Sequence, residues 1–113
     1  MGELKERMLK RDKDLAEGRY PSLELHEQDA VKWEVLYTRL LGIVQEGRET
    51  GRLISASPTV REFGECVFCI FTPEGEVAAF SRGILLHFAS FAATIKWMLA
   101  NDYEEEPGIK DGD

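Results

Sequence analysis

His87 is the residue of this 113-residue sequence best placed to do chemistry, and it is one of only two histidines. It stands where an apolar stretch turns into a helical pattern, directly before Phe88. An imidazole titrates near physiological pH, so at such a junction it can present a proton donor or acceptor to a cleft. The equally open alternative is a core histidine bonded to a backbone carbonyl. We therefore carry His87 forward as the single candidate catalytic residue.

Cys66 and Cys69 have the CxxC spacing of zinc and redox sites. A zinc site needs about four ligands, and no second Cys or His pair follows at ligand spacing. A redox pair normally opens a helix, whereas the alternation around these cysteines predicts a strand. Residues i and i+3 of a strand lie about 10 Å apart on opposite faces, out of disulfide reach. Two unpaired core cysteines are the better interpretation.

Two further groups could bind ions. Arg82, in a Ser-Arg-Gly break before the apolar stretch, could bind an anion or cap surface carbonyls. The run from Glu104 to Glu106 could attract a cation, although a solvated segment is the more common role of such a run. The sequence contains no P-loop, GxGxxG, HExxH or GxSxG motif. It therefore predicts no complete catalytic, nucleotide-binding or metal-binding set, and no cofactor held within the chain.

The composition limits the classes of function. A net charge of -7, with no basic stripe, argues against nucleic-acid binding, because phosphate contacts need clustered Lys or Arg. The N-terminus lacks the apolar core of a secretory signal, and His87 and Lys96 interrupt the most apolar run, 83–100. We expect a cytoplasmic protein with no membrane partner, built on one core or on part of a larger one.

The chain is expected to begin with an arm, residues 1–26. Residues 3–17 predict a short amphipathic helix that needs a docking partner, because isolated short helices are marginal. Its thin apolar stripe consists of Leu4, Met8 and Leu15. Gly18 ends the helix, and Tyr20–Leu25 is expected to be an extended connector.

Residues 27–113 are expected to form an incomplete domain that opens with a long helix from Asp29 to about Ser55. One face of this helix is apolar for about six turns. It consists of Trp33, Leu36, Leu40, Ile43, Val44, Gly47, Gly51 and Ile54. Each glycine costs about 1 kcal/mol relative to Ala inside a helix. The two are either tolerated defects or a flat spot where another backbone approaches closely.

A β-hairpin is expected after a connecting loop, 57–63. Glu65–Phe71 alternates with apolar residues on both faces, which predicts an interior strand covered on both sides. Thr72–Glu76 predicts the turn, because its proline presets φ and Gly75 can adopt the left-handed conformation. Val77–Phe80 is expected to return as the second strand.

A third helix is predicted from Phe88 to Asn101, with Lys96 as its one charged residue. A helix this apolar is either central in a larger fold or part of an interface. The predicted fold class is therefore α+β: helix, long helix, β-hairpin, helix, forming part of a larger multi-subunit α/β assembly.

Several short motifs follow one another along the chain in a specific order. They are Ile54-Ser55-Ala56-Ser57-Pro58, Gly64-Glu65-Cys66, Pro73-Glu74-Gly75, Gly83-Ile84-Leu85-Leu86-His87, Ala92-Ala93-Thr94-Ile95-Lys96-Trp97-Met98, Glu106-Pro107-Gly108-Ile109 and Asp111-Gly112-Asp113. In this order they resemble the N-terminal portion of the hydantoinase B type family, most closely its acetone and acetophenone carboxylase branch. The resemblance covers roughly residues 20–113.

This resemblance implies a bacterial, multi-subunit, ATP-dependent carboxylase that joins a ketone to bicarbonate-derived carbon dioxide. In the family, a hydantoinase A type subunit binds ATP, a small subunit completes the complex, and the hydantoinase B type subunit carries a divalent metal (Mn, Fe or Zn). The family's metal ligands follow shortly after a Gly-Asp pair that corresponds to Gly112-Asp113. The expectation is thus a truncated or split subunit, inactive alone, with the ATP and metal sites elsewhere and His87 as its pocket candidate.

Two other functions stay open. Hydantoinases and oxoprolinases open cyclic amides with ATP, but their branch commonly places a glycine soon after the histidine, where this chain has Phe88-Ala89-Ser90. The chain could also be a non-catalytic module that only assembles a partner complex.

Overall fold

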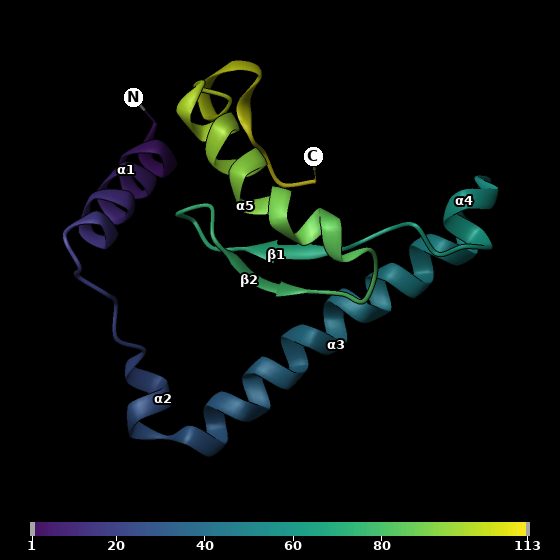
Figure 1. The fold of residues 1–113 in the computed structure, drawn as a ribbon, viewed down its shortest axis with the longest axis horizontal. Coiled ribbons are helices and arrows are strands. Elements are labelled where there is room, and N and C mark those ends of the chain that lie inside the picture. Colours follow the sequence, from purple (N-terminus) through teal and green to yellow (C-terminus); the bar gives the residue numbers. More distant parts are fainter. Residues whose placement is uncertain (1, 113) are drawn as a thin grey trace.

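The computed structural model describes residues 2–112. In chain order the elements are α1 (Glu3–Ala16), α2 (Glu24–Gln28), α3 (Ala30–Ile54), α4 (Pro58–Arg61), β1 (Cys69–Phe71), β2 (Val77–Phe80), α5 (Leu85–Ala100) and a π-type turn η1 (Glu104–Gly108). The β-hairpin lies between α3 and α5, and α1 lies beside the C-terminal end of α5 (Figure 1). The observed elements confirm the predicted α+β class.

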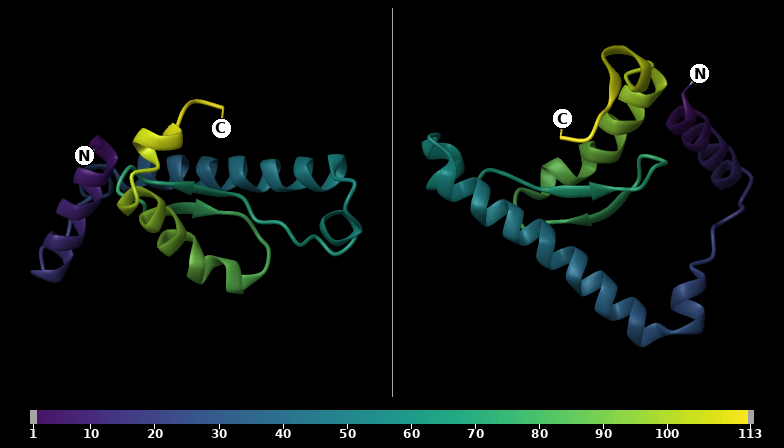
Figure 2. Two further views of the ribbon diagram at one scale, coloured as in Figure 1. Left: turned by 90° about the horizontal axis from the view of Figure 1, so that it is seen from above. Right: turned by 180° about the vertical axis from the view of Figure 1, so that it is seen from behind.

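The long helix is confirmed as α3, which has 25 residues. It begins after Asp29, whose carboxylate accepts a hydrogen bond from the backbone N–H of Lys32 at 3.0 Å, the usual N-cap arrangement. It ends where Ser55 becomes extended, shortly before Pro58. At 1.5 Å per residue α3 is about 37 Å long, and the hairpin lies along its C-terminal half (Figure 2).

The hairpin is antiparallel, with Cys69 opposite Phe80 and Ile70 opposite Ala79. Its turn closes as predicted: the N–H of Thr72 donates to the carbonyl of Glu76 at 2.7 Å. Gly75 has φ of +80°, the left-handed region that favours glycine.

The predicted interior strand from Glu65 to Phe71 is wrong in length, and it is not interior because the sheet has two strands among the described residues, although helices cover both of its faces as expected. β1 has three half-buried residues in a sheet of two strands among the described residues. The preceding segment forms other hydrogen bonds: the carbonyl of Cys66 accepts from Arg48 Nε at 3.1 Å, and the N–H of Phe68 donates to Ser81 Oγ at 3.0 Å. Apolar alternation alone does not supply the partner strand that a longer ladder requires.

The two faces of the hairpin pack on different helices. On one face Phe68 lies against α3. On the other, Phe71 meets Phe91 of α5 edge-on with ring centroids 6.2 Å apart, and Phe80 meets Phe88 at 4.7 Å. The phenylalanines of the helix predicted from Phe88 to Asn101 therefore cover one face of the hairpin.

Three boundaries differ from the sequence prediction. The expected connector Tyr20–Leu25 ends in the short helix α2, which docks where His26 meets Trp33 edge-on at 6.3 Å. The expected loop 57–63 contains α4, which starts with a proline at its first position, a favourable place because φ is already helical. α5 begins at Leu85, three residues before Phe88, so His87 lies inside the first turn of the helix.

The described residues enclose a small core. Its buried apolar side chains are Met8, Val44, Ala79 and Leu99. The radius of gyration is 16.2 Å, whereas a compact chain of this length has about 13 Å. The accessible surface is 8341 Å², against about 6,300 Å² for a compact monomer of 12.8 kDa. The fold is therefore open, with much of its apolar surface uncovered.

Candidate functional site

His87 is held in the first turn of α5 by its backbone and leaves its side chain exposed. Its N–H donates to the carbonyl of Ile84 at 3.1 Å, and its carbonyl accepts from Ser90 Oγ at 3.0 Å. The imidazole stacks on Phe91, with centroids 6.5 Å apart and an interplanar angle of 10°. In this chain the His87 imidazole is therefore a surface group that lies beside the Phe91 ring, and not a core histidine.

The loop before α5 is tightly fixed. Ser81 is buried, and its Oγ accepts from the N–H of Phe68 and donates to the carbonyl of Arg82, both at 3.0 Å. A Cβ on Gly83 would stand 2.4 Å from Val67 Cγ2 and 3.0 Å from the carbonyl oxygen of Cys66, so only glycine fits there. This packing sets the position at which α5, and with it His87, begins.

Arg82 does not use its guanidinium in this anchoring. Its backbone N–H donates to Gln45 Oε1 at 3.1 Å, and the residue is exposed. Within the described residues the Arg82 guanidinium caps no carbonyl, and anion binding by Arg82 stays a prediction.

The two cysteines are free and half-buried. Burial raises the pKa of the Cys69 thiol, which lowers its reactivity. Within residues 2–112, no three His, Cys, Asp or Glu side chains gather closely enough to hold a metal ion. The residues present therefore do not fit the divalent metal that the family resemblance implies.

Glu104 has a structural role that its sequence context did not reveal. Its carboxylate accepts hydrogen bonds from the N–H groups of Leu4, at 3.0 and 3.1 Å, and of Lys5, at 3.3 Å. It thereby caps the first turn of α1 from 100 residues away. Lys5 Nζ also forms an ion pair with Asp102 Oδ1 at 2.7 Å, so two interactions hold α1 to the segment after α5.

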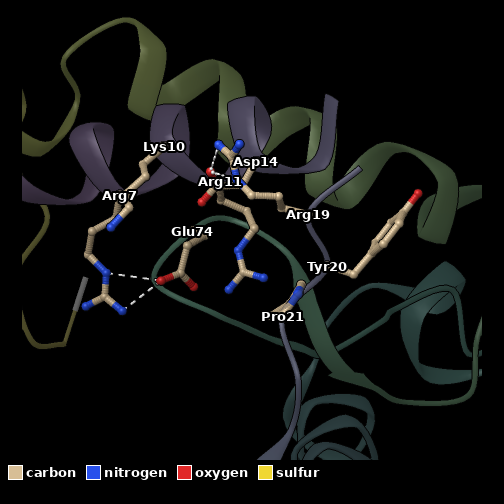
Figure 3. Close-up of a pocket in the computed structure, with 8 residues that line it drawn as sticks. All are labelled: Arg7, Lys10, Arg11, Asp14, Arg19, Tyr20, Pro21 and Glu74. Atoms are coloured by element: carbon tan, nitrogen blue, oxygen red, sulfur yellow. Dashed lines mark hydrogen bonds and ion pairs between the residues drawn. The ribbon is translucent and has the colours of Figure 1, made fainter. Parts of the chain in front are cut away.

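His87 lines neither of two cavities that open on the surface of the described residues. The basic pocket, about 420 Å³, lies between α1, the connector and the hairpin turn (Figure 3). Its charged lining residues are Arg7, Lys10, Arg11, Asp14, Arg19 and Glu74. The second cavity, about 560 Å³, is a mostly apolar groove between α5 and the C-terminal turn, bordered by Ile95, Met98, Tyr103 and Ile109.

Sequence reasoning did not find the basic pocket. The available signal was the helical spacing of Arg7, Lys10, Arg11 and Asp14, which places four charged side chains on one face of α1. Nothing local indicated that Glu74, 67 residues from Arg7, would lie opposite that face.

Among the helices of residues 2–112, none has the length and apolar content needed to cross a bilayer.

Comparison with known proteins gives concordant results. The family model described as hydantoinase B/oxoprolinase matches residues 29–113. The acetone carboxylase alpha subunit of Xanthobacter autotrophicus is 38% identical over 101 residues, which are 87% of this chain and 13% of that subunit. A solved nucleotide-free structure of acetone carboxylase, from work on ATP-dependent acetone carboxylation, superposes with a TM-score of 0.83 at 36% identity. The alignment covers 96% of this chain and 15% of the solved one, so this chain spans less than a sixth of either relative.

Proposed function

This chain belongs to the hydantoinase B/oxoprolinase family, and on that premise we propose that it supplies packing core and subunit interface to an ATP-dependent ketone carboxylase. The observation that carries the proposal is the likeness to acetone carboxylase, a TM-score of 0.83 over 96% of this chain. Because the chain spans only 13% of the relative, carboxylation would belong to an assembly in which this chain is one part. Residues 27–113 would be the incomplete domain and residues 1–26 its arm.

The uncovered surface supports this role. The accessible area exceeds that of a compact monomer by about 2,000 Å², which is comparable to the area buried in permanent subunit interfaces. Many of the exposed large apolar side chains lie on α3 and α5. The most exposed large apolar side chains of these two helices are Val31, Ile43, Leu53, Ile54, Leu86 and Trp97.

The partners would be the remainder of a metal-binding subunit, an ATP-binding hydantoinase A type subunit and a small subunit. The reaction would be a ligase reaction that forms a carbon–carbon bond between a ketone and bicarbonate-derived carbon dioxide in the cytoplasm. ATP and the metal, Mn, Fe or Zn, would be bound outside this chain. His87 would be the residue that this chain contributes to the reaction pocket.

A second candidate is ATP-dependent opening of a cyclic amide. The observation in its favour is that the matching family model is described by hydantoinase B and oxoprolinase together. The residues after His87 favour the carboxylase branch, because Phe88, Ala89 and Ser90 occupy the place where the hydantoinase branch commonly has glycine.

The test replaces the matching 101 residues of the Xanthobacter alpha subunit by this chain, within the complete enzyme. The readouts are ATP-dependent incorporation of labelled bicarbonate into acetone and hydrolysis of a panel of cyclic amides. We expect the chimaera to assemble and carboxylate, and a deletion of the same region to do neither. An assembled chimaera that opens cyclic amides but does not carboxylate would favour the second candidate. An assembled chimaera with neither activity would contradict both.

A further inference from the structure

We propose that the basic pocket is a binding site for a small dianion that carries a phosphate group. This proposal does not depend on the function proposed above. The pocket lies where the face of α1 that bears Arg7, Lys10 and Arg11 meets the hairpin turn at Glu74 and the connector at Tyr20 (Figure 3).

The charges around the pocket do not cancel. Four cationic and two acidic side chains line it, which leaves a local charge of +2 in a chain whose net charge is -7. Arg7 binds Glu74 through Nε and Nη2, at 3.1 and 2.7 Å. Arg19 binds Asp14 through Nε at 3.1 Å and through Nη2 at 2.5 Å. Both acids are therefore already paired.

Lys10 and Arg11 are the cations left over. Both help to lower the pKa of the Asp14 carboxyl through their charge, but no hydrogen bond or ion pair within residues 2–112 fixes either side chain. The Arg11 guanidinium points between Glu74 and Pro21 (Figure 3). Like charges at i,i+4, such as Arg7 and Arg11, destabilise an isolated helix by a few tenths of a kcal/mol. A bound anion would remove this repulsion.

The donors suit a phosphate group. The Arg11 guanidinium offers two parallel N–H groups that match two phosphate oxygens, and the Lys10 ammonium, which extends toward Arg7, adds positive charge to the lining of the pocket (Figure 3). The pocket volume of about 420 Å³ is within the range of small-molecule sites and larger than one phosphate ion needs. The Pro21 ring lies at the edge of the pocket, where the organic part of a phosphate monoester could contact it, whereas the Tyr20 ring is 79% exposed and points away from the charged side chains (Figure 3).

The test is isothermal titration calorimetry of the whole chain at pH 8 and constant ionic strength, with inorganic phosphate and with phenyl phosphate. We expect saturable one-to-one binding of at least one of them. Tighter binding of phenyl phosphate would identify a site for phosphorylated metabolites, whereas equal affinities would identify a site for free phosphate. If neither ligand binds saturably, the proposal is wrong.

Two matched double variants distinguish binding at the basic pocket from nonspecific attraction of the phosphate to positive charge on the chain. Lys10→Gln/Arg11→Gln should weaken binding by about tenfold or more, because two charge-assisted contacts are lost. Lys32→Gln/Arg39→Gln removes the same charge from the exposed surface of α3 and should leave binding unchanged. An equal loss in both variants would overturn the proposal.

A measurement on the unmodified chain covers the case in which the Lys10/Arg11 variant does not fold. Phenylglyoxal modifies accessible arginines, and peptide mass spectrometry reports the rate at each one. Phosphate should slow modification of Arg11 and not of Arg39. Equal rates at Arg11 with and without phosphate would contradict binding at this pocket.

Discussion

The ring of Phe68 lies against the backbone of α3 at Gly51, where a Cβ atom would stand 3.0 Å from both Cε2 and Cζ of that ring. At Gly47, one turn earlier, a Cβ would stand 3.1 Å from Cδ1 of the same ring. The glycine pair is therefore a flat spot and not a tolerated defect. The group that approaches is an aromatic side chain, where the sequence had suggested another backbone. This contact joins the hairpin to α3.

Gly51→Ala should lower the free energy of unfolding by about 1 kcal/mol or more, because the new methyl overpacks against Phe68 and outweighs the gain in helix propensity. Gly42→Ala is the matched control on the same helix, since nothing lies within 4 Å of its added Cβ. It should raise stability by about 0.5–1 kcal/mol. Urea unfolding measures both variants, and equal stabilisation by the two would refute the contact.

Glu104→Ala should loosen α1 from the rest of the chain by about 1–2 kcal/mol, because two backbone N–H groups lose a charged acceptor. Hydrogen exchange should accelerate at the amides of Leu4 and Lys5. Glu34→Ala, an exposed acid on α3, should leave those two amides unchanged. Unchanged exchange in Glu104→Ala would mean that α1 is held by other contacts.

Glu74 should make stability depend on pH. Burial raises its pKa, but hydrogen bonds from Arg7, from its own backbone amide and from Thr72 together outweigh burial, so the pKa lies below the ordinary 4.5. The folded state thus binds this proton less readily than the unfolded state. The stabilisation is fully present above the unfolded pKa and is lost as pH falls through the folded pKa.

The check is the difference in urea midpoint between the unmodified chain and Glu74→Gln, measured from pH 6 downward. The difference should shrink below about pH 4.5 and vanish at lower pH. Glu34→Gln should show no such trend, and a Glu74 difference that stayed constant would contradict the assignment.

His87→Ala in the assembled enzyme should lower turnover by about 100-fold, the usual contribution of a general acid or base, without loss of assembly. His26→Ala removes the other histidine, on α2, and should leave turnover unchanged. Unchanged turnover in His87→Ala would instead support a module that only assembles its partners.

The sequence predicted the elements whose signals are local. The cap at Asp29 and the turn closed by Gly75 lie where expected, because the chemistry that fixes them is within a few residues. β1 was predicted too long because apolar alternation does not reveal whether a partner strand exists. The cap of α1 by Glu104 depends on packing between distant segments, which no local pattern records. The catalytic role of His87 stays a prediction.

The most direct test of the central claim, that this chain is one part of a larger core, is hydrogen exchange along α5. The chain alone is compared with the chain placed in the complete carboxylase. We predict weak protection from Phe88 to Leu99 in isolation and slowing of about tenfold or more in the assembly, where the exposed side of the helix becomes covered. Full protection of this helix in a compact, isolated monomer would contradict the claim.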